Sequence, residues 1–273
     1  MKFFSILSLV ILFLVSVTAF IPQLSCSTRM KTSLAMTESS NRAEETPSLL
    51  LSKLNAITLE GPTKLILASQ SPRRREILDM MGLRGRYTVQ FSPLDEEALQ
   101  EELAEKDLTP QEYTSILAQE KAKALAEALV GDDYSPDDTI YILGSDTIVD
   151  YDVHILNKPQ NETQAIEMLS QLSGNYHYVH TGVAIYKLEA SNTEISSVTL
   201  ADSFVETAKV KFATLSVADI KAYVNTGEPM DKAGAYGIQG IGGQMVEEMQ
   251  GDFFTVMGLP MHSLSKCLAK LLS

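Results

Sequence analysis

The chain has 273 residues, of which 45% are hydrophobic and 21% charged, a composition typical of a globular protein with one large or two small cores. Its formal net charge of -13 argues against general nucleic-acid binding, which needs a basic surface, but allows a local basic site for a small anion. The sequence has two cysteines, Cys26 and Cys267, without CxxC or Cys/His spacing, so we expect neither a disulfide framework nor a zinc site.

Residues 1–19 have the plan of a signal peptide. Lys2 precedes an apolar run over residues 3–17, and small residues follow near Ala19. The run is short for a membrane span, and an uncleaved signal anchor is the alternative. We expect no membrane segment in the mature domain.

Residues 20–60 read as a transit-like presequence followed by a polar linker. Residues 20–37 contain six Ser/Thr, two basic residues and no acidic residue, which is transit-peptide composition. A signal peptide followed by such a stretch resembles the bipartite presequences of algae with secondary plastids. We therefore expect plastid delivery, with the ER or secretion as the first alternative and the cytoplasm if the presequence is inactive.

Residues 61–273 show strand and helix patterns that interleave, which predicts one α/β domain with two lobes and a cleft. The acidic residues 95–97 are expected to form a turn. We expect strands over residues 64–69, 87–91, 139–149, 153–156, 176–186 and 204–212, helices that begin after Ser71, Thr109, Asn161 and Ser216, and a last helix over residues 259–271.

Three adjacent arginines, Arg73, Arg74 and Arg75, fall in the first turn of the helix expected after Ser71. A helix N-terminus carries partial positive charge, so cations there repel the helix dipole and one another. A bound phosphate would remove this conflict, because backbone N–H groups and guanidinium forks both bind it. The alternative is a solvated basic turn that faces acidic loops.

Two further charged residues interrupt apolar patterns. Lys121 lies on the apolar stripe of its helix, four residues from both Leu117 and Leu125, and an inward lysine needs a partner. Asp146 interrupts the buried strand pattern TIYILGSDTIV, so it is expected to be paired, to bind a metal or to do chemistry. Lys158 could supply its partner charge. The alternatives are a lysine that snorkels to solvent and an aspartate in a strand-end turn.

Residues 227–243, GEPMDKAGAYGIQGIGG, contain six glycines in seventeen residues. Glycine allows close backbone approach and positive φ, and the polar side chains of Glu228, Asp231, Lys232 and Gln239 are interleaved with apolar ones. The segment has neither the P-loop nor the dinucleotide fingerprint. We interpret it as a binding loop.

Five blocks follow one another in residues 64–273, namely LILASQSPRRREIL, LAQEKAKAL, GSDTIVDYDVHILNKP, LSGNYHYVHTGVAIY, and the glycine-rich segment followed by GDFFTVMGLP. Together these blocks resemble the Maf family of nucleoside triphosphate pyrophosphatases. The resemblance implies a long mixed β-sheet flanked by helices, with two lobes and a central cleft, similar to inosine triphosphate pyrophosphatases. It also implies hydrolysis of a nucleoside triphosphate to the monophosphate and pyrophosphate with Mg²⁺ or Mn²⁺, and a homodimer.

The same resemblance implies roles for individual residues. Asp146 would accept the proton of the attacking water, although a metal-binding role is the alternative. Glu96, Asp146 and Glu228 are the candidate metal ligands. The triphosphate would be held by Arg73, Arg74, Lys121 and Lys158, with hydroxyl contacts from Ser69 and Ser71.

Three positions indicate the dTTP/UTP type within the family, namely Arg73, Thr147 after the aspartate, and Gln239 in GIQG. The 7-methyl-GTP type carries Gln after the aspartate, commonly Trp at the first arginine, and no GIQG; Ser145 occurs in that type as well. The leading function is a house-cleaning hydrolase of dTTP, UTP or modified pyrimidine nucleotides. The alternatives are a 7-methyl-GTP pyrophosphatase and a nucleotide-binding regulator of cell division with incidental catalysis.

Overall fold

The computed structural model describes residues 48–130, 135, 137–191 and 194–273. The expected signal peptide, the transit-like residues 20–37 and the first part of the expected linker lie outside these residues. No helix within the described ranges is long and apolar enough to cross a membrane.

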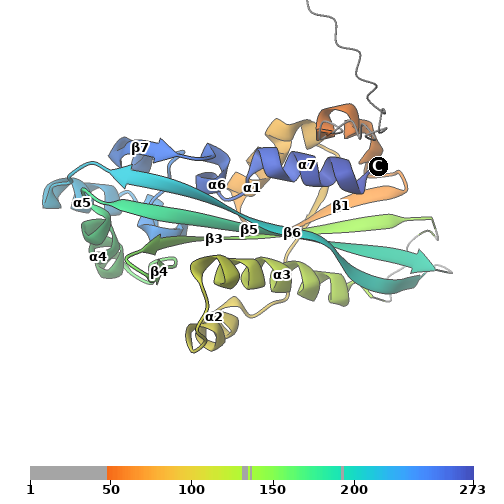
Figure 1. Ribbon diagram of the computed structural model, residues 1–273, viewed down its shortest axis with the longest axis horizontal. Helices are drawn as coiled ribbons and strands as arrows, with labels where there is room; N and C mark the ends of the chain where they lie inside the picture. Colours follow the sequence, from red (N-terminus) through yellow and green to blue (C-terminus); the bar gives the residue numbers. More distant parts are fainter. Residues whose placement is uncertain (1–47, 131–134, 136, 192–193) are drawn as a thin grey trace, which may run out of the picture. The chain divides into compact units, whose positions relative to one another are not determined.

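Seven strands form one mixed sheet in the order β2-β1-β3-β5-β6-β7, with β4 paired to β3 (Figure 1). β1 is parallel to β2 and β3, and the other pairings are antiparallel. The expected mixed sheet with flanking helices is confirmed.

The strands are β1 Thr63–Ala68, β2 Thr88–Gln90, β3 Thr139–Tyr151, β4 His154–Leu156, β5 Tyr176–Ser191, β6 Glu194–Phe212 and β7 Val246–Gln250. The α-helices are α1 Pro72–Leu78, α2 Glu96–Ala104, α3 Pro110–Ala128, α4 Glu162–Leu172, α5 Val217–Val224, α6 Phe253–Met257 and α7 Met261–Leu271. Short helical turns are η1 Leu50–Ser52, η2 Leu54–Ala56, η3 Asp79–Leu83, η4 Glu228–Asp231, η5 Ala233–Ala235 and η6 Ile241–Met245.

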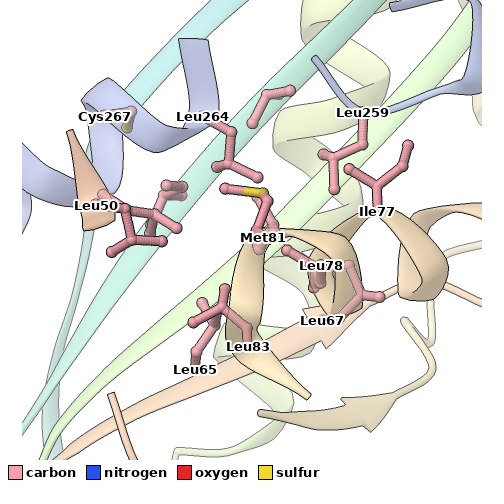
Figure 2. Close-up of a cluster of buried hydrophobic side chains, with 14 of the residues drawn as sticks. Leu50, Leu65, Leu67, Ile77, Leu78, Met81, Leu83, Leu259, Leu264 and Cys267 are labelled. Carbon is pink, nitrogen blue, oxygen red and sulfur yellow. The ribbon is translucent and has the colours of Figure 1, made fainter. Parts of the chain in front are cut away.

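Alternation along β3 builds a core on each face of the sheet. Ile140 and Ile142 pack with α3, whereas Tyr141 and Leu143 join a cluster with α1 and α7 on the opposite face. Figure 2 shows this second cluster, in which side chains of β1, α1, η3 and α7 meet. The sheet is therefore covered by α3 on one face and by α1 and α7 on the other (Figure 1).

A separate cluster covers the other end of the long strands, where Val149, Val179 and Phe212 pack with α4 and α5. The two lobes and central cleft expected from the sequence stay a prediction. Along its length, β3 changes its neighbour: β1 pairs with residues 139–143 and β4 pairs with residues 149–151. Among the described strands, residues 144–148 of β3 therefore pair with β5 alone. One edge of β3 is open at this point.

The structure corrects several sequence expectations. The acidic residues 95–97 do not form an isolated turn, because Asp95 caps α2 by accepting from the backbone N–H of Ala98 at 3.1 Å. Strands β5 and β6 run further than expected, and β7 and α6 were not predicted. Within residues 48–60, which the sequence places in the linker, Leu50 and Ile57 are buried in the core.

Candidate active site

Two glycines let α3 lie close against the sheet at the open edge of β3. A Cβ at Gly144 in β3 would lie 2.5 Å from the carbonyl oxygen of Ala118, and a Cβ at Gly182 in β5 would lie 2.6 Å from that of Thr114. Larger residues would force the helix away. This close packing places the α3 side chains directly over Asp146, which faces α3 by the alternation of β3.

Lys121 and Asp146 form a buried ion pair at this contact. The Lys121 Nζ lies 2.5 Å from Asp146 Oδ1 and 2.8 Å from Glu96 Oε2, and both Lys121 and Asp146 are less than a tenth exposed. Two carboxylates therefore compensate the burial of the ammonium. The inward position of Lys121 is confirmed. Glu96 reaches the pair because it begins α2, the helix that the sequence did not predict.

Arg74 is held by hydrogen bonds to three segments, of which β3 contributes Thr147, on the face of the sheet opposite to Asp146. Its Nε donates to the carbonyl oxygen of Gly258 at 2.8 Å, Nη1 donates to Ser69 Oγ at 3.1 Å and Nη2 donates to Thr147 Oγ1 at 3.3 Å. Burial lowers the pKa of Arg74 from its usual value, and the nearby carboxylates of Asp146 and Glu96 partly offset this effect. Arg74 therefore lies in the electric field of the same two carboxylates that bind Lys121.

The residues beside Asp146 in β3 both support Arg74. Ser145 is fully buried and donates to the carbonyl oxygen of Gly258 at 3.0 Å, the same oxygen that accepts from Arg74. Thr147 Oγ1 lies 2.9 Å from Thr181 Oγ1, which donates to the carbonyl oxygen of Thr255 at 2.7 Å. The hydroxyl of Ser145 is thus committed to the backbone, which weakens its value as an indicator of substrate type.

Arg73 and Gln239 lie on an outer rim that joins α1 to the glycine-rich segment. Arg73 Nη1 donates to Asp231 Oδ2 at 3.0 Å, and Gln239 Nε2 donates to Glu76 Oε2 at 2.6 Å. Glu76 follows Arg73 by one helical turn. Arg73 of α1 therefore contacts a carboxylate of the glycine-rich segment, and Gln239 of that segment contacts a carboxylate of α1.

Glu228 holds the glycine-rich segment in shape. Its carboxylate accepts from the backbone N–H groups of Ile241 at 2.9 Å and Gly242 at 3.1 Å, and from the Tyr223 hydroxyl at 3.0 Å. Burial alone would raise the pKa of Glu228, but these hydrogen bonds outweigh burial and lower it. The structure thus gives Glu228 a supporting role, while Glu96 and Asp146 meet at Lys121. Metal binding by Glu228 stays a prediction.

Lys158 is exposed and follows Asn157, which links the loop after β4 to α3 and to η5. Asn157 Nδ2 donates to the Tyr113 hydroxyl at 3.3 Å, and the Asn157 carbonyl oxygen accepts from the N–H of Gly234 at 3.2 Å. Burial raises the pKa of Tyr113, the hydrogen bond with Asn157 partly offsets this effect, and the charge of Asp146 raises the pKa further. The sequence analysis treated Tyr113 only as an apolar residue, although it lies on the stripe of Lys121 two turns earlier.

Ser71 occupies the N-cap position of α1, as expected, but its side chain makes no capping hydrogen bond. Its backbone N–H donates to Ser69 Oγ at 3.2 Å. The first turn of α1 therefore retains a hydroxyl that the cap does not use, beside Arg73 and Arg74.

Comparison with known families decides the assignment. A family model described as a Maf-like protein matches residues 64–271. The chain belongs to the Maf family. A protein of Colwellia psychrerythraea named dTTP/UTP pyrophosphatase is 43% identical over 208 residues, which are 76% of this chain and 87% of that protein. A protein of the same name from a Geobacillus species is 41% identical over 198 residues, 72% of this chain and 92% of its own length. A human protein named as a probable bifunctional dTTP/UTP pyrophosphatase/methyltransferase is 42% identical over 208 residues, 76% of this chain and 32% of that protein.

The described residues of this Maf protein contain no group of three or more His, Cys, Asp or Glu side chains suited to hold a metal ion. Asp146 and Glu96 nevertheless bring two carboxylates to one point at Lys121. Mg²⁺ is commonly held by one or two carboxylates together with substrate phosphates and water. The pair thus fits an ion whose coordination is completed by the substrate.

Proposed function

We propose that this chain is a nucleoside triphosphate pyrophosphatase that converts dTTP and UTP to their monophosphates and pyrophosphate. The observation that carries the proposal is the buried Lys121–Asp146–Glu96 cluster at the open edge of β3, with Arg74 close by. The names of the relatives support the same activity. Thr147 and Gln239, the positions that indicate the dTTP/UTP type, both contact residues of this region.

The proposed chemistry is attack of water on the α-phosphorus. The water oxygen bonds to that phosphorus as the bond to the bridging α–β oxygen breaks, and pyrophosphate leaves with the bonding electrons. Asp146 takes the proton of the water. Lys121 occupies its Oδ1, and no hydrogen bond to Oδ2 occurs among the described residues, so Oδ2 is the atom assigned to the water.

Fixed cations would neutralise the triphosphate. Arg73 and Arg74 lie in the first turn of α1, where backbone N–H groups also favour an anion. We assign Lys158 to the same task because it is exposed on the loop that Asn157 ties to Tyr113. A Mg²⁺ or Mn²⁺ ion, when bound, would neutralise further phosphate charge, and Asp146 and Glu96 are the residues that would hold it.

Pyrophosphate release from a panel of nucleotides tests the proposal. The panel is dTTP, UTP, CTP, GTP and 7-methyl-GTP, with Mg²⁺ or Mn²⁺. We expect release from dTTP and UTP, and a loss of about 100-fold or more in kcat for Asp146→Asn, because general base catalysis contributes about that factor. Asp152→Asn, at the exposed tip of the same hairpin, is the matched control and should retain activity.

The other outcomes separate chemistry from specificity. Release from 7-methyl-GTP alone would retain the mechanism and overturn the pyrimidine assignment. Release from no nucleotide would overturn the enzymatic proposal and favour a nucleotide-binding regulator. Circular dichroism of Asp146→Asn checks that the fold survives the loss of one carboxylate from the buried cluster.

A further inference from the structure

Glu76 is an exposed carboxylate to which the sequence analysis gave no role. It lies three residues after Arg73 in α1, a rise of about 4.5 Å along the helix axis. Its Oε2 accepts a 2.6 Å hydrogen bond from Nε2 of Gln239. Arg73 makes a second link from α1 to the same segment, through Asp231. Gln239 and Arg73 therefore provide two separate links between α1 and the glycine-rich segment.

The backbone on both sides of Gln239 is fixed, so its side chain has a defined origin. On one side, the N–H of Gly237 donates to the Tyr223 hydroxyl at 3.2 Å. On the other side, Ile241 and Gly242 donate to Glu228. A Cβ at Gly240 would lie 2.5 Å from Glu228 Oε1, so the loop is packed against this carboxylate. What is left to determine is the orientation of the Gln239 amide.

Glu76 determines that orientation by its chemistry. An ionised carboxylate only accepts hydrogen bonds, whereas a glutamine amide has a donor end and an acceptor end. The NH₂ end of Gln239 must therefore face Glu76, and the carbonyl Oε1 must face away from it. The amide thus presents its acceptor on the side away from Glu76.

We propose that Glu76 is a specificity residue that acts through Gln239 to select uracil and thymine over cytosine. This inference rests on the proposed function. Uracil and thymine carry an N–H donor at N3, whereas N3 of cytosine is an unprotonated acceptor. An Oε1 atom held toward the base accepts from N3–H and repels the lone pair of cytosine. A site built to pair with a substrate N–H discriminates against an analogue that lacks it.

The test compares UTP with CTP in the purified protein and in Glu76→Gln. The substitution keeps the shape but offers Gln239 either a donor or an acceptor, so the amide is free to turn over. We expect the ratio of kcat/KM for UTP over that for CTP to fall about three- to tenfold, the size of one neutral hydrogen bond. The same substitution in a Gln239→Ala background should leave the ratio unchanged. Glu127→Gln, which removes an exposed charge from α3, is the control for charge alone.

A second readout separates this inference from the proposed function. Calorimetric titration with UTP and CTP measures their dissociation constants in Asp146→Asn and in the double variant Asp146→Asn/Glu76→Gln. The affinity ratio should fall by the same factor. A ratio that Glu76→Gln does not change, or equal binding of UTP and CTP by Asp146→Asn, overturns the role of Glu76. Absence of hydrolysis in every protein overturns the proposed function alone, because the affinity ratio still reports on Glu76.

Discussion

The hydroxyl groups on the far face of β3 set the direction of a short hydrogen-bond chain that ends on Arg74. Thr181 gives its single proton to the carbonyl oxygen of Thr255, so its oxygen accepts from Thr147. The Thr147 proton is then committed to Thr181, and the Thr147 oxygen accepts from Arg74. Thr147 therefore acts as a positioning residue for the guanidinium of Arg74.

This series of hydrogen bonds predicts that Thr181→Val weakens catalysis by disturbing the position of Arg74. Valine keeps the shape but removes the proton donor, which frees the Thr147 hydroxyl to turn away from its present orientation. We expect kcat/KM for UTP to fall about five- to tenfold, the effect of one lost hydrogen bond. Thr181→Ser retains the hydroxyl and should be close to the wild type. In an Arg74→Ala background the Thr181→Val effect should vanish, and an equal loss in both backgrounds would contradict the coupling.

At the scale of single elements, the sequence predicts those whose signals are local. The capping box at Thr109 and Glu112 predicted the start of α3, and the apolar stripe predicted that Lys121 faces inward. Helix α2 was missed because it is short and five of its nine residues are polar, so its apolar face is narrow and buries only Leu103. The partners of Lys121 and Gln239 were missed for another reason, since they come from distant elements and depend on how these pack. Local patterns contain no such information.

The segment before β1 is a second element without a local signal, because its two short 3₁₀ turns have no helical period. Leu50 is 2% exposed and packs in the cluster of α1 and α7, whereas its neighbour Leu51 is 72% exposed. The Leu50 N–H also donates to Ser265 Oγ at 3.0 Å, and Lys53 Nζ donates to the carbonyl oxygen of Ala269 at 2.8 Å. These contacts attach residues 50–56 to α7.

Leu50→Ala is therefore expected to lower the free energy of unfolding by about 2–4 kcal/mol, because it removes a buried side chain and leaves a cavity. Leu51→Ala, one residue later and exposed, should change it by less than about 0.5 kcal/mol. Urea unfolding followed by circular dichroism measures both. Similar values for the two variants would show that this segment contributes no core.

At the scale of the whole molecule, the site lies where strand pairing in the sheet changes from parallel to antiparallel. Parallel strands β1 and β2 lie on one side of β3, and antiparallel strands β5, β6 and β7 lie on the other (Figure 1). Asp146 sits where β1 has ended and β4 has not begun. Ligands of open α/β sheets commonly bind at such a switch in topology. The sequence predicted most of these strands but not their order, because strand pairing joins residues far apart in the chain.

His177 in β5 adds a pH dependence of stability that is separate from catalysis. His177 is 1% exposed, its Nε2 lies 2.9 Å from the Tyr236 hydroxyl, and its ring packs edge-on against Phe212 and Tyr236. Burial lowers the pKa of His177 to about 4. The unfolded chain, with a histidine pKa of about 6.5, therefore binds this proton at a higher pH than the folded protein does. Stability contributed by neutral His177 is complete above pH of about 6.5 and is lost as the pH falls toward 4.

His177→Gln removes this titration and keeps a polar partner for Tyr236. The difference in unfolding free energy between wild type and variant should shift against the wild type by up to about 3 kcal/mol between pH 7 and pH 4. His180, whose pKa is also lowered by burial, is present in both proteins and cancels from the difference. The exposed His154→Gln is the control for the loss of one histidine. Denaturant unfolding across this pH range measures the shift. Parallel profiles for wild type and His177→Gln would show that the buried imidazole does not couple protonation to folding, and that acid sensitivity arises elsewhere in the molecule.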